Sequence, residues 1–163
     1  MNKQRIVSFV AASSNSGKTT LIEKLVPILK ARGMRVAVIK HAPKGFDLDK
    51  PGKDSWRFQQ AGADVVALVG PGSMAVMTSL GHEPTEAELQ LAAAGADIVL
   101  CEGFKSISSN KVEVFRSGIS GDKPLCLGDP AIHALVSDKE FKVPIPWFEL
   151  NDAEGVARFL VHL

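Results

Sequence analysis

Two kinds of apolar pattern alternate along the chain. Short continuous apolar runs are typical of strands buried on both faces, whereas longer segments with apolar residues every three or four positions are typical of helices with one buried face. The patterns predict strands at residues 5–12, 36–40, 64–69, 74–78, 98–101, 112–115 and 132–136, and helices at residues 17–32, 54–61, 85–94 and 152–163. The strand at 112–115 alternates polar and apolar residues, which favours an exposed or edge position.

The order of these elements predicts the fold class. Strands that alternate with helices imply a parallel core with right-handed crossovers. Residues 70–73 (GPGS) join two strands directly, and Pro followed by Gly suits the central positions of a type II turn, so we expect a hairpin there. The chain is therefore expected to form one domain over residues 1–163, with a three-layer α/β fold and a mixed, mainly parallel sheet that has an antiparallel hairpin portion.

Composition and charge narrow the class of protein. The chain has 163 residues, of which 45% are hydrophobic and 23% charged, the balance of a globular protein. Its formal net charge of +1 argues against a nucleic-acid binder driven by a dense basic stripe, and no apolar run approaches the roughly 18 residues that span a bilayer. Cys101 and Cys126 lack the spacing of a zinc site, and we expect both cysteines to be reduced. We therefore expect a cytoplasmic protein. The charge and the lengths of the apolar runs predict neither nucleic-acid nor membrane partners.

A phosphate-binding loop is the strongest chemical signal in the sequence. Residues 12–20 (ASSNSGKTT) lie between the first strand and the first helix and match the pattern Gly, four residues, Gly-Lys-Ser/Thr, except that Ala12 replaces the first glycine. Backbone N–H groups at the start of a helix converge on phosphate, and Gly17 lets the main chain approach without a Cβ in the way. Alanine is acceptable at position 12 only if its φ is negative. The loop predicts a P-loop NTPase fold that binds a purine nucleoside triphosphate.

The loop residues have separate expected roles. Lys18 is placed to meet the β- and γ-phosphates, Thr19 offers a hydroxyl to Mg²⁺, and Thr20 can donate to the α-phosphate. Asn15 and Ser16 complete the expected set of nucleotide contacts. Each charge-assisted hydrogen bond of this kind contributes roughly 1.5–3 kcal/mol. Together these contacts are expected to hold a nucleoside triphosphate with Mg²⁺.

Acidic residues that follow predicted strands are candidates for the magnesium shell and for catalysis. Ligands bind outside the carboxyl ends of parallel strands, so Glu102, which ends the strand at 98–101, is the expected second metal contact if that strand neighbours the first. The loop after the second strand carries Asp47 and Asp49, either of which could reach Mg²⁺. Asp49 and Glu102 are the candidate catalytic residues. Structural alternatives stay open, because Glu102 could cap the following turn and Asp54 could be the N-cap of the next helix.

Base recognition has one candidate in the sequence. Guanine-specific proteins often use an Asp whose carboxylate accepts hydrogen bonds from guanine N1–H and N2–H₂. Asp138, which follows the predicted strand at 132–136, is the candidate for this role, with a surface turn as the alternative. His41, at the end of the second strand, is equally consistent with a structural histidine and with a ligand contact.

Four segments together point to one known family: residues 16–21 (SGKTTL), 39–41 (IKH), 47–55 (DLDKPGKDS) and 101–105 (CEGFK). Over nearly its whole length, the chain resembles the molybdopterin-guanine dinucleotide biosynthesis protein B family. Members of that family are GTP-binding homodimers with weak GTP hydrolysis, and they assist a guanylyltransferase that attaches GMP to molybdopterin. The resemblance implies GTP and Mg²⁺ as cofactors, and the guanylyltransferase, molybdopterin and a second copy of the chain as partners.

Three functions follow as hypotheses. The resemblance favours a GTP-binding accessory protein of molybdenum cofactor biosynthesis that is at most a weak GTPase, with Gly17, Lys18 and Thr19 at the phosphates and magnesium and Glu102 as the second acidic site. The alternative is a P-loop small-molecule kinase in which an Asp of residues 47–54 accepts the proton of a substrate hydroxyl. The third, a GTPase metallochaperone, is disfavoured because the sequence has no His/Cys cluster.

Overall fold

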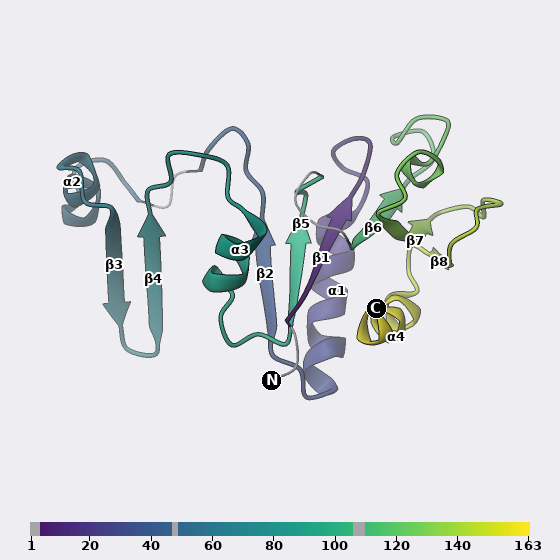
Figure 1. Ribbon diagram of the computed structural model, residues 1–163, viewed down its shortest axis with the longest axis horizontal. Helices are drawn as coiled ribbons and strands as arrows, with labels where there is room; N and C mark the ends of the chain where they lie inside the picture. Colours follow the sequence, from purple (N-terminus) through teal and green to yellow (C-terminus); the bar gives the residue numbers. More distant parts are fainter. Residues whose placement is uncertain (1–3, 47–48, 106–109) are drawn as a thin grey trace. The chain divides into compact units, whose positions relative to one another are not determined.

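The structure of the chain is a computed structural model that describes residues 4–46, 49–105 and 110–163. The chain divides into two compact units (Figure 1). We call Met1–His41 together with Thr85–Leu163 the sheet unit, and Ala42–Pro84 the hairpin unit. The expectation that the whole chain is a single nucleotide-binding domain stays a prediction.

A six-stranded parallel sheet forms the centre of the sheet unit (Figure 1). Its strands are β1 (Arg5–Val10), β2 (Val36–Lys40), β5 (Ile98–Glu102), β6 (Lys111–Phe115), β7 (Ile132–Ser137) and β8 (Trp147–Glu149). Their order across the sheet is β2-β5-β1-β6-β7-β8, so β1 lies between β5 and β6. Because every neighbouring pair is parallel, the carboxyl ends of all the strands meet at one edge, where ligands bind in sheets of this kind.

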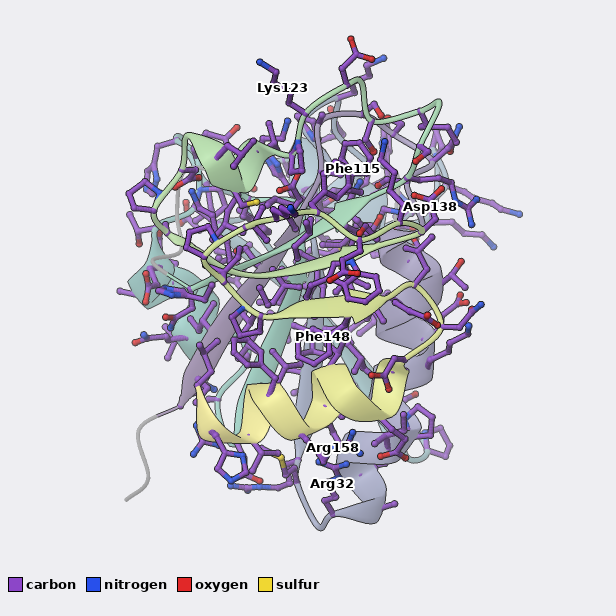
Figure 2. The ribbon with its side chains drawn as sticks, turned by 90° about the vertical axis from the view of Figure 1, so that its right-hand side faces the viewer. Arg32, Phe115, Lys123, Asp138, Phe148 and Arg158 are labelled. Atoms are coloured by element: carbon purple, nitrogen blue, oxygen red, sulfur yellow. The ribbon has the colours of Figure 1, made fainter. Side chains whose placement is uncertain are left out.

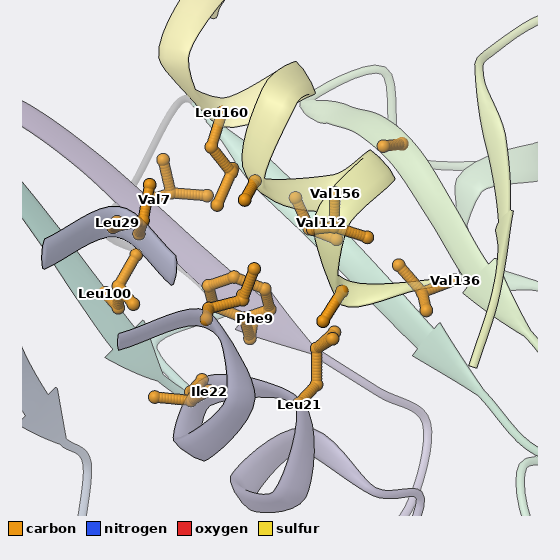
Figure 3. Close-up of a cluster of buried hydrophobic side chains, with 14 of the residues drawn as sticks. Val7, Phe9, Leu21, Ile22, Leu29, Leu100, Val112, Val136, Val156 and Leu160 are labelled. Atoms are coloured by element: carbon orange, nitrogen blue, oxygen red, sulfur yellow. The ribbon is translucent and has the colours of Figure 1, made fainter. Parts of the chain in front are cut away.

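Helices cover both faces of this sheet. On one face, α1 (Lys18–Ala31) and α4 (Ala153–His162) pack against Phe9 of β1 in the main core (Figure 3). On the other face, α3 (Glu86–Ala92) packs beside Ile6, since successive residues of a strand point to opposite faces. The helices on both faces and the mainly parallel sheet confirm the expected three-layer α/β class.

The hairpin unit contains the expected antiparallel strand pair. β3 (Val65–Gly70) and β4 (Ser73–Thr78) pair with each other in a separate two-stranded sheet. Gly72, in the turn between them, has a φ of 78°, which is the conformation that the third residue of a type II turn requires. The predicted hairpin is therefore confirmed, with its strands in a sheet of their own.

β6 overturns the expectation of an exposed or edge strand in this segment. It lies between β1 and β7, and all of its residues are buried. The polar residues of β6, including Glu113, which suggested exposure, have internal partners. The Glu113 carboxylate accepts hydrogen bonds from the backbone N–H groups of Leu125 and Cys126 at 2.7 and 2.9 Å. The Lys111 ammonium lies 2.8 Å from the Asp129 carboxylate, so protein groups replace the solvent that these polar side chains would otherwise need.

Helix ends and lengths complete the description of the fold. α2 (Asp54–Gln60), in the hairpin unit, has Lys53 as its N-cap, so the interpretation of Asp54 as the N-cap is wrong by one residue. The charge of Asp54 still lies in the first turn, at the positive end of the helix dipole. Within the part of the chain that the structure describes, no helix has both the length and the apolar character needed to cross a membrane.

Candidate nucleotide-binding site

The phosphate-binding loop connects β1 to α1 at the carboxyl edge of the parallel sheet. Gly17 is the N-cap of α1 with a φ of 101°, and Asn15 has a φ of 61°. Left-handed residues in such a loop are typical of concavities in which successive N–H groups bind an anion. Ala12 is not one of the described residues with positive φ, so it meets the condition under which alanine can replace the first glycine.

Lys18, the first residue of α1, has its side chain folded back against the loop. Its ammonium donates to the carbonyl oxygen of Ser13 at 3.3 Å and to the hydroxyl of Ser16 at 3.2 Å. The Ser13 hydroxyl donates to the carbonyl oxygen of Ile119 at 2.8 Å, which ties the loop to the segment after β6. An anion bound by the amides of the loop would therefore meet the charge of Lys18.

The electrostatic surroundings of Lys18 favour an anionic ligand. Burial lowers the pKa of Lys18 from its ordinary value of 10.5. The Glu102 carboxylate opposes this effect, while the charges of Lys105 and Lys40 lower the pKa of Lys18 further. A polyphosphate would offset both the desolvation of the ammonium and the repulsion among the three lysines.

Thr19 and Glu102 form the candidate magnesium site. β5 lies directly beside β1, as this interpretation of Glu102 required. The Thr19 hydroxyl donates to the Glu102 carboxylate at 2.8 Å, and the Lys40 ammonium lies 3.7 Å from the other carboxylate oxygen. Hydroxyl and carboxylate oxygens are hard ligands that suit Mg²⁺. Because the described residues contain no group of three or more His, Cys, Asp or Glu side chains that could hold a metal, phosphate oxygens and water would supply the remaining ligands.

A tight turn after β5 holds Glu102 at the sheet edge. Gly103 and Phe104 both have positive φ, at 95° and 57°. The Phe104 ring stacks on the imidazole of His41 with 4.6 Å between ring centroids. A Cβ at Gly103 would lie 3.1 Å from the Cβ of His41, so this close approach of two strand ends favours glycine. His41 both packs on Phe104 and lines the cavity described next, so its two interpretations stay open.

The loop opens onto a cavity of about 670 Å³, a size typical of small-molecule sites. On the β5 side of β1, the cavity is lined by the ends of β2 and β5. On the opposite side it is lined by Arg116, which follows β6, and by Leu150 and Asn151, which follow β8. The Lys24 ammonium of α1 donates to the side-chain oxygen of Asn151 at 3.0 Å. Sequence reasoning missed Asn151, because β8 has only three residues and its pattern is too short to be recognised. Arg116 directly follows the predicted strand at 112–115, and its position at the sheet edge was the signal that could have identified it.

Most of the expected site residues line this one cavity: Asn15, Ser16, Gly17, Lys18, Thr19, Thr20 and Glu102. Asp138, labelled in Figure 2, follows β7 and is outside the described lining. Its carboxylate accepts hydrogen bonds from the Ser117 backbone N–H at 3.0 Å and from the Ser117 hydroxyl at 3.1 Å. The backbone bond from Ser117 is the main reason that the pKa of Asp138 lies below its usual range.

The aspartates of the loop after β2 fall outside this cavity. Asp49 belongs to the hairpin unit, where it lines a different cavity of about 700 Å³ together with Trp56. Its carboxylate accepts a hydrogen bond from the Lys50 backbone N–H at 2.8 Å. Asp47 lies outside the described residues. The catalytic roles suggested for Asp49 and Asp47 stay predictions.

Similarity to known proteins assigns the chain to a family. A family model described as "Molybdopterin guanine dinucleotide synthesis protein B" matches residues 6–138. The chain belongs to this family. Among its relatives are the molybdopterin-guanine dinucleotide biosynthesis adapter proteins of Escherichia coli and Haemophilus influenzae, which are 38% and 35% identical to it. These alignments cover 93% and 98% of this chain, and 89% and 90% of the two relatives.

Solved structures of protein B family members have the same fold. A crystal structure of a molybdopterin-guanine biosynthesis protein B (MobB) matches with a TM-score of 0.74 at 25% identity, over 98% of this chain and 99% of that one. The structure of Bacillus subtilis MobB matches with a TM-score of 0.72 at 26% identity, over 98% of each chain. The family model and the relatives are named for molybdopterin-guanine dinucleotide biosynthesis, so the comparisons do not favour the small-molecule kinase alternative.

Proposed function

We propose that this chain is an adapter protein of molybdopterin guanine dinucleotide biosynthesis, which binds GTP with Mg²⁺ and assists the guanylyltransferase that joins GMP to molybdopterin. Family membership and the names of the relatives support the pathway. The observation that carries triphosphate binding is the phosphate loop with Lys18 at the start of α1, beside the Thr19–Glu102 pair. The family resemblance favours GTP as the triphosphate.

The start of α1 would hold the phosphates. A helix N-terminus offers N–H groups and partial positive charge, to which Lys18 adds a full charge. A Cβ at Gly17 would meet no protein atom within 4 Å, so the space in front of this residue is open to a ligand. Thr19 and Glu102 would hold Mg²⁺, which neutralises charge on the terminal phosphates when it is bound.

Strong GTP hydrolysis is not expected from this arrangement. Among the described residues that line the cavity, only Glu102 has a carboxylate side chain. This carboxylate accepts a hydrogen bond from Thr19 and forms an ion pair with Lys40. A base that activates water needs a free acceptor within hydrogen-bond reach of it. We therefore propose at most weak GTPase activity, so that the adapter acts through binding. Molybdopterin as a partner, the homodimer and the cytoplasmic location remain predictions.

Lys18→Ala tests nucleotide binding directly. The variant removes the charge that faces the phosphates, so calorimetry should show at least about a tenfold loss of Mg-GTP affinity for the lost charge-assisted bonds. Lys123→Ala, which removes an exposed lysine outside the cavity lining, is the matched control and should bind like the wild type. An unchanged affinity in Lys18→Ala would show that the loop does not hold the phosphates.

A pull-down with purified guanylyltransferase tests the adapter role separately. We expect the two proteins to associate in the presence of Mg-GTP and molybdopterin. Failure to associate, with Mg-GTP binding intact, would argue against the adapter role while leaving the nucleotide site standing.

A further inference from the structure

The two sides of the phosphate-loop cavity differ in chemistry. The β5 side presents the Thr19 hydroxyl and the Glu102 carboxylate, which are ligands for a cation. The opposite side is lined by Arg116 and Asn151, and the ammonium of Lys24 donates to the side-chain oxygen of Asn151. This second side is rich in hydrogen-bond donors, which suit the acceptor atoms of a bound nucleotide.

The direction of a bound nucleotide follows from the proposed function, on which this step rests. Thr19 and Glu102 would hold Mg²⁺ next to the terminal phosphates of a bound triphosphate, which would set those phosphates on the β5 side. The nucleoside then extends along the sheet edge toward the ends of β6 and β8. β8 is three strands from β1, which is about 14 Å at the usual strand spacing of about 4.8 Å. Arg116 and Asn151 therefore lie where the base would be.

Asn151 has a well-defined backbone position between β8 and α4. The preceding residue, Leu150, donates its backbone N–H to the carbonyl oxygen of Ser137 at 3.1 Å. The following residue, Asp152, is the N-cap of α4, and its carboxylate accepts the Gly155 N–H at 2.8 Å. A residue anchored on both sides can present its side chain to a ligand at little cost in conformational entropy.

Lys24 determines which way the Asn151 amide faces. An ammonium is a donor only, so the group 3.0 Å from it is the amide oxygen, and the NH₂ group is left to donate elsewhere. Guanine presents two acceptors, O6 and N7, on its outer edge, whereas adenine presents an amino donor in place of O6. Donors from Asn151 and Arg116 thus complement guanine and oppose the amino group of adenine.

We propose that Asn151 is the specificity-determining residue for guanine, with its amide NH₂ donating to O6 or N7 of the base. Lys24 is a positioning residue that orients this amide, and Arg116 adds a second donor on the same side of the cavity. This assignment places base recognition after β8 rather than at Asp138, whose carboxylate is bonded to Ser117.

The GTP-to-ATP affinity ratio, measured by calorimetry with Mg²⁺, tests the proposal. Asn151→Asp replaces the NH₂ donor by an acceptor of the same shape and should lower the ratio about tenfold or more. Because both nucleotides carry the same phosphates, the added negative charge cancels in the ratio. Asn151→Ala, which removes the donor, and Lys24→Met, which removes the group that orients it, should also lower the GTP-to-ATP ratio. Gln60→Glu makes a matched amide-to-acid change in the hairpin unit, outside the lining of this cavity, and should leave the ratio unchanged.

Several outcomes would overturn the inference. One is an unchanged ratio in Asn151→Asp and Asn151→Ala, and another is a ratio that collapses in Asp138→Asn but not in the Asn151 variants. A wild-type chain that binds both triphosphates equally would overturn the inference while leaving phosphate binding intact. A wild-type chain that binds neither triphosphate would contradict the proposed function itself, and the inference with it.

Discussion

At the scale of single residues, the buried carboxylate of Glu113 organises the segment that follows β6. It is fully buried and accepts two backbone N–H groups, one of them from Cys126. The same carboxylate disfavours a second negative charge nearby. Burial first, and the charge of Glu113 next, raise the pKa of the Cys126 thiol from 9.0 to about 11. The half-buried position of Cys126 therefore does not make it a reactive cysteine.

We expect the Cys126 thiol to be alkylated slowly at neutral pH. The thiolate is the nucleophile, so a pKa of about 11 in place of 9.0 lowers its fraction about 100-fold at any pH well below 9. The labelling rate should rise with pH toward a midpoint near 11, and Glu113→Gln should move that midpoint down, because the repelling charge is lost. Iodoacetamide labelling at a series of pH values, read peptide by peptide in a mass spectrometer, measures this. A wild-type midpoint near 9 would contradict the prediction.

At the scale of elements, the first turn of α4 shows how a cap and a glycine depend on each other. The Asp152 carboxylate accepts the Gly155 N–H at 2.8 Å, and a Cβ at Gly155 would run into that same carboxylate. Glycine inside a helix costs roughly 0.5–1 kcal/mol relative to alanine. Loss of a side-chain N-cap costs about 1 kcal/mol, so the two effects oppose each other here.

This opposition predicts a non-additive pair of substitutions. Gly155→Ala should change the free energy of unfolding little in the wild type, because the gain in helix propensity is offset by displacement of the Asp152 cap. In an Asp152→Ala background the cap is already absent, and Gly155→Ala should then stabilise the chain by roughly 0.5–1 kcal/mol. Urea unfolding of the four proteins gives the coupling. Equal effects of Gly155→Ala in both backgrounds would show that the side chains do not interfere.

Elements of the fold and the site were predictable from the sequence where their signals are local. The strands β1 and β5, the helix α1 and the phosphate loop were predicted because their signals are local apolar patterns and one contiguous motif. The burial of β6 was not, because Lys111 meets Asp129 across 18 positions and no local pattern reveals that partner. Asn151 was missed because β8 has only three residues, and its contact with Lys24 spans 127 positions, so no local pattern reveals it.

At the scale of the whole molecule, the two units differ in what they contribute. The buried residues of both hydrophobic core clusters, and all the described residues that line the phosphate-loop cavity, belong to the sheet unit. The hairpin unit instead exposes large apolar side chains on its strands, with Val69 78% and Met74 69% exposed. Contiguous exposed apolar surface commonly marks an interaction site. Nucleotide binding and self-association should therefore depend on different units.

Replacing Ala42–Pro84 by a flexible Gly-Ser linker should separate these two properties. The shortened chain keeps the complete core and cavity lining of the sheet unit, so we expect it to fold and to bind Mg-GTP with close to wild-type affinity in calorimetry. The homodimer that the family resemblance implies should be lost in sedimentation equilibrium, because the exposed apolar strands have been removed.

A full-length control makes this last prediction independent of the deletion. The double substitution Val69→Ser and Met74→Ser keeps the hairpin but removes its two most exposed apolar side chains among those of β3 and β4. It should weaken self-association while Mg-GTP binding stays unchanged, since neither residue lines the phosphate-loop cavity. If the substituted chain and the shortened chain both remain dimeric, the interface lies in the sheet unit. If the shortened chain folds but loses Mg-GTP, the nucleotide site needs the hairpin unit, and the division of roles between the two units is wrong.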